Sequence, residues 1–282
     1  MAGIKRRDFI KNAAFGGAAA LAIPGGSFPL RGSAEGRSTP TRIPLGLASY
    51  TLRAFDLDQT IAMTNRVALK KIVLKSMHLP LESSPSEITA AAEKVRSDGL
   101  DLYGCGVVYM TTEAEVEQAF KYAGTAAMKM IIGVPNPELL GLVERKVKQT
   151  DIRVAVHNHG PEDKLYPTPL SAYEKIKGLD NRIGLCIDIG HTMRAGVDPA
   201  EAAGKFFDRL LDVHIKDVSS ATKEGQTVEI GRGVIDIPKF IRTLIKLNYA
   251  GTLAFEYEKD EKDPLPGLAE SVGFVRGVLA AV

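Results

Sequence analysis

The chain has 282 residues, of which 45% are hydrophobic and 25% charged, a composition typical of a globular protein with one sizeable core. The formal net charge of +2 arises in residues 1–42, which hold seven basic and two acidic side chains, so removing that excess of five leaves about −3 for residues 43–282. That charge argues against a nucleic-acid partner, and the two cysteines, Cys105 and Cys186, are predicted to be buried thiols rather than a disulfide framework.

Residues 1–42 are predicted to be a signal peptide and linker. The basic segment Lys5-Arg6-Arg7-Asp8-Phe9-Ile10-Lys11 precedes a small-residue apolar stretch from Ala13 to Ile23, which is too short to anchor the chain stably in a membrane. The paired arginines resemble the twin-arginine export signal. This resemblance implies the twin-arginine export machinery as a partner and a periplasmic location.

From Ile43 onward, short apolar runs rich in β-branched residues alternate with helical segments. The predicted strands are Leu45–Ser49, Lys71–Leu74, Leu100–Val108, Lys129–Val134, Ile152–His157, Ile183–Asp188, Leu210–Ile215 and Gly251–Tyr257. Between them, the helix starts have capping boxes or a cap followed by proline: Ser84-Pro85-Ser86-Glu87, Thr112-Glu113-Ala114-Glu115, Asn136-Pro137, Thr168-Pro169 and Asp198-Pro199.

Eight strand–helix units in residues 43–282 predict a single (β/α)₈ TIM barrel as the catalytic domain. An open doubly wound sheet is the alternative. That fold normally has a glycine-rich phosphate loop after its first strand, and Ala48-Ser49-Tyr50-Thr51 is not such a loop.

Histidines and carboxylates gather at the ends of the predicted strands. All five histidines lie there, and two carboxylates end strands of the same set: His78, His157, His159, His191, His214, Asp188 and Glu256. The carboxyl ends of barrel strands converge on one face, where barrel enzymes place their reacting groups. Because an unpaired charge buried there is costly, these imidazoles and carboxylates predict a divalent-metal site.

Four motifs resemble the successive motifs of the xylose-isomerase-like TIM-barrel superfamily: Asp188-Ile189-Gly190-His191, His214-Ile215-Lys216-Asp217, Gly231-Arg232-Gly233-Val234-Ile235-Asp236 and Phe255-Glu256. This superfamily includes sugar isomerases and epimerases, inosose dehydratases and, more distantly, apurinic endonucleases. The resemblance runs from about the second strand to the C-terminus and is strongest over residues 152–258.

The resemblance implies a metal site made of Asp188, His214 and Glu256, with a fourth ligand after the fifth strand. That ligand is usually glutamate in the epimerases, whereas this chain has His157, in a His-Asn-His run more similar to dehydratase-type branches. The mixed set favours one Mn²⁺, Zn²⁺ or Co²⁺ ion over Mg²⁺.

The expected activity is proton abstraction next to the carbonyl of a keto sugar or keto-glycoside, through an enediolate that the metal stabilises. Isomerase or epimerase is the family default, and a lyase or dehydratase working by β-elimination is the alternative. Glu256 or Glu258 is expected to transfer the proton, with His157 or His159 opposite. An endonuclease-type phosphodiesterase and a non-catalytic sugar-binding barrel are further alternatives, and a homo-oligomer stays open.

Other polar side chains near the strand ends are predicted to bind the substrate, although a solvated surface position is the alternative for several. They are Lys75, His78, Glu162, His191, Lys216 and Arg232. His191 is also expected to orient Asp188. Tyr50 and Tyr103 are expected either to wall the sugar or to pack in the core.

Overall fold

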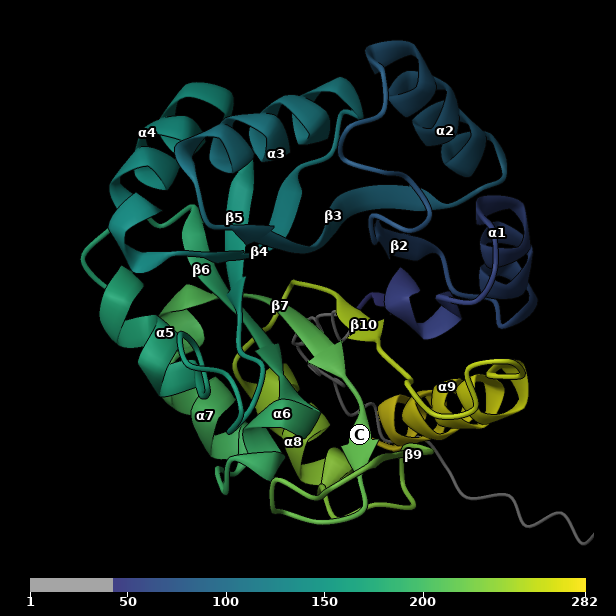
Figure 1. The fold of residues 1–282 in the computed structure, drawn as a ribbon. Helices are drawn as coiled ribbons and strands as arrows, with labels where there is room; N and C mark the ends of the chain where they lie inside the picture. The colour runs from purple at the N-terminus through teal and green to yellow at the C-terminus, as the bar shows by residue number, and fades with distance from the viewer. Residues whose placement is uncertain (1–42) are drawn as a thin grey trace, which may run out of the picture. The chain divides into compact units, whose positions relative to one another are not determined.

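The computed structural model describes residues 43–282, so the predicted signal peptide and linker lie outside the described residues. The described chain is a closed, parallel eight-stranded barrel with the strand order β1-β10-β7-β6-β5-β4-β3-β2 (Figure 1). The strands are β1 (Leu45–Ala48), β2 (Lys71–Leu74), β3 (Asp101–Met110), β4 (Met130–Pro135), β5 (Arg153–His157), β6 (Ile183–Asp188), β7 (Leu210–Ile215) and β10 (Leu253–Phe255). The predicted (β/α)₈ barrel is confirmed.

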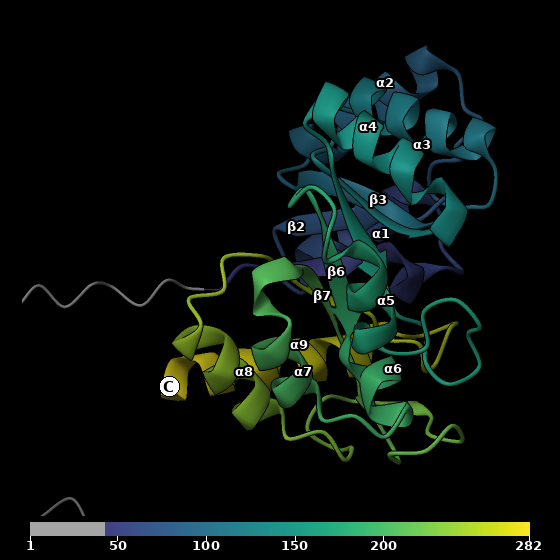
Figure 2. The same cartoon turned by 90° about the vertical axis from the view of Figure 1, so that its left-hand side faces the viewer.

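Helices surround the barrel: α1 (Leu57–Arg66), α2 (Pro85–Ser97), α3 (Glu113–Thr125), α4 (Leu140–Thr150), α5 (Pro169–Ile176), α6 (Ile189–Arg194), α7 (Pro199–Lys205), α8 (Ile237–Lys246) and α9 (Leu265–Ala281). Figure 2 shows α2, α3 and α4 grouped beside β3, with α7, α8 and α9 on another side of the barrel. Over residues 43–282, no helix combines the length and apolarity needed to cross a membrane.

Most of the predicted helix starts have the expected caps. The side chains of Ser84, Thr112 and Thr168 each accept a hydrogen bond from the backbone N–H three residues on, and Asp198 caps α7. Asn136 is the exception. Its Nδ2 donates to Glu138 Oε1 over 3.1 Å, so the side-chain amide is used without capping, and a short 3₁₀ helix, η2 (Pro137–Leu139), precedes α4.

The strand boundaries differ from the prediction mainly at β3 and β10. β3 continues to Met110, whereas β10 ends at Phe255, so Glu256 lies one residue beyond its strand. A small antiparallel pair, β8 (Asp217–Val218) and β9 (Thr227–Val228), was not predicted, because two-residue strands are too short to show a period. The alternating apolar residues Val156, Val213 and Phe255 are buried, which leaves the polar positions between them to the barrel mouth.

Candidate metal centre

Four side chains from four strand ends converge in the barrel mouth. His157 is the last residue of β5, Asp188 the last of β6, His214 lies in β7, and Glu256 follows β10. All four are buried, and one ligand atom from each lies within 4.8 Å of the others. The structure therefore brings together the four residues that the sequence predicted as metal ligands.

The distances within this group are short. Nε2 of His157 lies 3.2 Å from Nδ1 of His214 and 3.6 Å from Oδ2 of Asp188. Nδ1 of His214 lies 3.0 Å from Oε2 of Glu256. Two imidazole nitrogens and two carboxylate oxygens around one point are a donor set suited to a divalent transition metal.

Two buried polar atoms of this group are short of partners. Nε2 of His214 makes no hydrogen bond, and Oδ2 of Asp188 has no partner of hydrogen-bonding geometry, although a lysine ammonium contacts it. Buried polar atoms normally have hydrogen-bond partners, and a buried carboxylate oxygen of the donor set that is in contact with an ammonium group lies where a cation is favoured. The residues present therefore fit a divalent metal.

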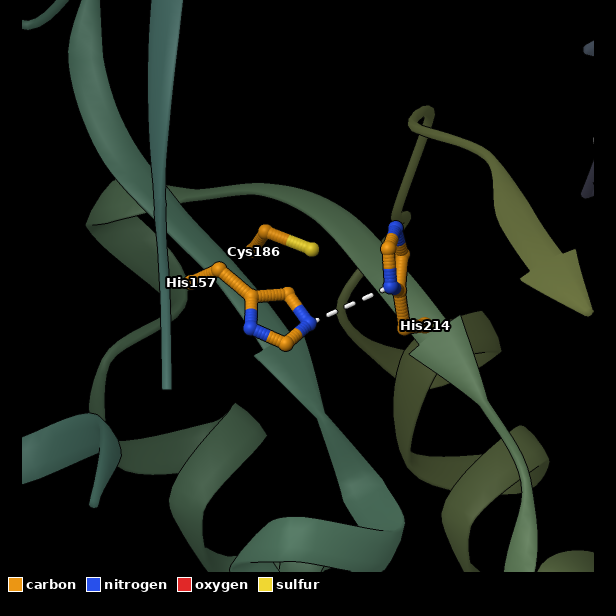
Figure 3. Close-up of side chains that lie close together, drawn as sticks. All are labelled: His157, Cys186 and His214. Carbon is orange, nitrogen blue, oxygen red and sulfur yellow. Dashed lines mark hydrogen bonds between the residues drawn. The ribbon is translucent and has the colours of Figure 1, made fainter. Parts of the chain in front are cut away.

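A thiol lies beside the two imidazoles. Figure 3 shows His157 and His214 directed toward each other and the sulfur of Cys186 pointing toward His214. Cys186 lies two residues before Asp188 on the same inward face of β6, and its thiol is buried. Burial raises the pKa of this thiol well above its ordinary value, so the group stays protonated in the metal-free protein.

Asp188 is held in place by hydrogen bonds with the first turn of α6 and with the side chain of Asn158, which follows β5. Its Oδ1 accepts a hydrogen bond from the backbone N–H of His191 over 2.8 Å, which caps α6. Asn158 accepts from the Asp188 N–H over 3.1 Å and donates to the Asp188 carbonyl over 3.3 Å. Asn158 was not predicted as a site residue, since it lies on the opposite face of the strand from His157 and His159.

The imidazoles differ in the direction in which their pKa is shifted. Burial lowers the pKa of His157 to about 4, despite the nearby Asp188 carboxylate, and burial together with His157 lowers the pKa of His159 to about 2. For His214, burial acts in the same direction, but the carboxylates of Glu256, Asp212 and Asp188 together outweigh it and raise the pKa. A metal ligand must be neutral at the donor nitrogen, so the lowered pKa of His157 favours metal binding, whereas the raised pKa of His214 opposes it.

Lys216 is fully buried among the carboxylates rather than free in the cavity as a substrate-binding group. Its Nζ lies 2.9 Å from Asp188 Oδ2 and 2.9 Å from Glu256 Oε2, and it also contacts Glu258. Although burial opposes charge on each group, these contacts raise the pKa of Lys216 and lower those of Asp188 and Glu256. The prediction of a substrate contact for Lys216 is thus replaced by that of an internal ion pair.

A cavity of about 320 Å³ opens next to the metal-ligand candidates. It is lined by Tyr50, Lys75, Val107, Tyr109, His157, His159, His191, Glu256 and Glu258. Of these residues, Tyr109 was missed, because it lies at the end of a strand that proved longer than predicted. Its hydroxyl lies 3.3 Å from Nε2 of His159, and the two rings are stacked.

Besides Lys216, three of the residues predicted to bind substrate do not line this cavity: His78, Glu162 and Arg232. His78 uses both ring nitrogens internally, with Nδ1 2.9 Å from Ser49 Oγ and Nε2 3.1 Å from the Leu52 carbonyl. Arg232 is exposed and pairs with Glu270 through two hydrogen bonds of 2.6 and 2.7 Å. His78 therefore supports the turn after β1, and Arg232 forms a surface salt bridge.

Glu162 and His191 are connected by an arginine that was not predicted. Arg194 Nη2 donates to Glu162 Oε1 over 2.5 Å and to the Lys223 carbonyl over 2.6 Å, while Nη1 lies 3.2 Å from His191 Nδ1. Glu162 itself does not line the cavity. Arg194 thus ties the loop after β5 and the β8–β9 loop to an imidazole in the cavity wall.

The motif residue Asp217 has a structural role. Its carboxylate accepts backbone N–H bonds from Val218, Gly231, Gly233 and Ile235 at 2.9–3.2 Å. A Cβ at Gly233 would lie 2.1 Å from Asp217 Oδ1, so only glycine fits. The two motifs His214-Ile215-Lys216-Asp217 and Gly231-Arg232-Gly233 therefore form one unit that shapes the loop after β7.

Tyr103 belongs to the barrel interior rather than to the cavity wall. Its hydroxyl donates to Asp212 Oδ2 over 3.3 Å. Asp212 lies two residues before His214 in β7, on the same face of the strand and farther from the barrel mouth. Of the two tyrosines named from the sequence, only Tyr50 lines the cavity.

Comparison with known proteins agrees with this architecture. A family model described as xylose isomerase-like TIM barrel matches residues 138–278. Among curated relatives, the rhizopine catabolism protein MocC of Rhizobium meliloti is 27% identical over 46% of this chain, and the chain spans 43% of that relative's length. An inosose dehydratase of Clostridium perfringens is 23% identical over 69% of this chain and 74% of its own.

Among solved structures, the IOLI protein with a bound zinc atom superimposes with a TM-score of 0.72 over 85% of this chain and 99% of its own, at 15% identity. At that identity, the likeness shows the fold alone. The chain is therefore similar to xylose isomerase-like TIM barrels and to an inosose dehydratase, and it has a buried His, Asp and Glu cluster at the mouth of the barrel.

Proposed function

This chain belongs to the xylose isomerase-like TIM barrel family, and on that premise we propose that it is a metal-dependent lyase that removes water or another β-leaving group from a cyclic keto sugar or keto-cyclitol. The observation that carries the proposal is the convergence of His157, Asp188, His214 and Glu256 beside a cavity of about 320 Å³. The dehydratase named among the curated relatives supports the same class of reaction.

His157, Asp188, His214 and Glu256 are the residues that would hold the metal. A divalent cation bound there would polarise a substrate carbonyl and stabilise the negative charge that develops as the adjacent carbon loses its proton. Mn²⁺, Zn²⁺ and Co²⁺ suit this mixed set better than Mg²⁺, which prefers an all-oxygen environment. The zinc atom in the similar barrel supports this choice.

Glu258 is the group best placed to take the proton. Glu256 belongs to the group of four candidate ligands and is held by His214, so it is better placed as a ligand than as a base. Glu258 lines the cavity outside that group, and its carboxylate pairs only with Lys216 among the described residues. The electron pair left on the carbon forms the double bond as the β carbon–oxygen bond breaks.

Lys75 is the charged donor for the leaving oxygen. It lines the cavity with Glu258, its Nζ donates to the Val107 carbonyl over 2.6 Å, and burial lowers its pKa toward the range in which an ammonium group gives up a proton readily. The sequence favoured His157 or His159 as the acid. Burial keeps both imidazoles neutral, which suits a ligand and a hydrogen-bonding wall better.

Isomerisation or epimerisation is the second candidate. Its first step is the same proton abstraction, and the presence of both Glu256 and Glu258 in the cavity wall favours it, because one carboxylate can return a proton that the other removed. A phosphodiesterase is disfavoured, since these two carboxylates repel a phosphate and Lys75 is the only cation among the described lining residues.

We propose that the substrate is unphosphorylated and that the protein acts on it outside the cytoplasm. This follows from the twin-arginine-like segment in residues 1–42 together with the acidic cavity wall. Fusing residues 1–42 to a reporter protein tests the location: export that stops when Arg6 and Arg7 are replaced by lysine supports it, and cytoplasmic retention of the unchanged fusion contradicts it.

The activity is tested with metal-loaded protein and a panel of keto sugars, 3-keto-glycosides and keto-cyclitols in deuterated water. Loss of water or of an aglycone, with appearance of a conjugated enone, is the expected result. A recovered isomer that carries solvent deuterium at the carbon next to the carbonyl indicates the isomerase or epimerase instead. If no member of the panel exchanges a proton or reacts, the proposed function is wrong.

A further inference from the structure

A buried ammonium group already neutralises part of the metal-donor set. Nζ of Lys216 lies 2.9 Å from Asp188 Oδ2 and 2.9 Å from Glu256 Oε2. These are the oxygens that face the imidazoles, because Asp188 Oδ2 is 3.6 Å from His157 and Glu256 Oε2 is 3.0 Å from His214. The side chain of Lys216 is only 2% exposed, so water contributes little to the solvation of its charge.

The charges around Lys216 do not cancel. Asp188, Glu256 and Glu258 contribute three negative charges within contact distance of one ammonium group, which leaves a formal charge of −2. Asp188 and Glu256 are buried, and an uncompensated buried carboxylate is strongly destabilising. One divalent cation would balance this charge.

We propose that Lys216 is the resident cation of this centre: its ammonium group holds the Asp188 and Glu256 carboxylates together while no metal is bound, and it competes with the entering divalent cation for the same two oxygens. The inference rests on the metal centre of the proposed function and adds the group that the ion has to displace. Glu258, which Lys216 already contacts, keeps the ammonium group paired after the displacement.

Removing the ammonium group should therefore strengthen metal binding. In the Lys216→Met variant the metal-free protein contains two buried carboxylates without a cation, whereas the metal-bound protein loses only a neighbouring positive charge that repels the ion. Both effects favour the bound state. A supporting role for Lys216 in the metal-bound site predicts the opposite, because the variant would then bind metal more weakly.

The experiment titrates Mn²⁺ and Zn²⁺ into metal-free wild-type, Lys216→Met and Lys71→Met proteins by calorimetry. Lys71 pairs with Asp101 outside the metal centre and is the matched control. We expect Kd to fall at least tenfold in Lys216→Met and to stay unchanged in Lys71→Met. We also expect the Tm of Lys216→Met to lie below that of the wild type without metal, with a larger rise in Tm on metal addition.

The outcomes separate this inference from the proposed function. Metal binding by the wild type with an equal or higher Kd in Lys216→Met overturns the role of Lys216 and leaves the metal centre intact. If neither protein binds Mn²⁺ or Zn²⁺, the metal centre is wrong and the inference fails with it.

A second measurement covers the case in which Lys216→Met does not fold without metal. The ¹⁵Nζ signal of Lys216 in wild-type protein, assigned by its absence from the Lys216→Arg variant, is followed by NMR as Zn²⁺ is added. Displacement of the ammonium group predicts a large shift of this signal at one equivalent of Zn²⁺. A signal that stays in place while Zn²⁺ binds contradicts the proposal.

Discussion

His157 Nε2 and His214 Nδ1 lie 3.2 Å apart at the mouth of the barrel, although 57 residues separate them in the chain. The two strands that carry them, β5 and β7, both neighbour β6, whose last residue is Asp188. Burial keeps His157 neutral, and its pKa is about 4. Two imidazole nitrogens thus face one point with a carboxylate beside each, and this arrangement is the basis for the proposed metal centre.

Asn158 should influence metal affinity without contacting the metal. It holds the backbone N–H and carbonyl of Asp188, and its Nδ2 also donates to Thr192 Oγ1 over 3.2 Å. We expect Asn158→Ala to weaken metal binding by roughly ten- to a hundredfold, as is usual when a group that orients a ligand is lost. Calorimetry measures the effect, with the surface variant Arg232→Ala as control. Unchanged affinity would mean that β6 positions Asp188 unaided.

Glu256→Gln and Glu258→Gln should separate the ligand from the base. We expect Glu256→Gln to lose metal content, because the amide is a poorer donor than the carboxylate. We expect Glu258→Gln to keep its metal and to lose about a hundred- to ten-thousand-fold in kcat, which is typical for loss of a general acid or base. Metal analysis alongside kinetics decides between the two, and the reverse pattern would make Glu256 the base.

Arg194 should affect substrate binding more than the chemical step. It links Glu162, the Lys223 carbonyl and His191, so Arg194→Met releases the loop after β5 and frees the His191 ring. We expect a severalfold rise in KM with a smaller change in kcat and no change in metal content. Glu162→Gln removes only the loop contact and should show a milder form of the same effect. An equal fall in kcat for both variants would contradict this account.

Asp217 should contribute to stability rather than to chemistry. Its carboxylate accepts four backbone N–H hydrogen bonds. A hydrogen bond to a charged group typically contributes about 1.5–3 kcal/mol to the free energy of unfolding. We expect Asp217→Ala to reduce the free energy of unfolding by about 3 kcal/mol or more, because it leaves several of these groups unsatisfied. Thermal unfolding in the presence of metal measures this. A stable Asp217→Ala protein that has lost activity would assign the residue to catalysis.

The fold and the convergence of the four candidate ligands could be predicted because both rest on repeated local signals. Eight apolar runs separated by caps specify the barrel, and strand alternation places His157, Asp188 and His214 on its inward face. Glu256 could be placed by the same argument although β10 ends one residue before it. Convergence then follows from the parallel closure of the barrel.

The partners of these residues could not be predicted, because their contacts depend on geometry between distant segments. From its position directly after β7, Lys216 is expected to be a cavity lysine, but its long side chain places the ammonium group against the carboxylates of Asp188 and Glu256. His78 shares the strand-end position of the other histidines, but Ser49 and Leu52 occupy both of its ring nitrogens. The position of a residue in the sequence predicts the strand face on which its side chain lies, but not the group that the side chain contacts.

The central claim is that His157, Asp188, His214 and Glu256 hold one divalent cation, and anomalous diffraction tests it most directly. Crystals of the protein grown with Mn²⁺, Zn²⁺ or Co²⁺ should show one strong anomalous peak at the absorption edge of the metal, within about 2–2.5 Å of a donor atom from each of the four side chains. The peak should be absent from crystals of Asp188→Ala and His214→Ala grown in the same way. A peak elsewhere, or full metal content in both variants, would contradict the account.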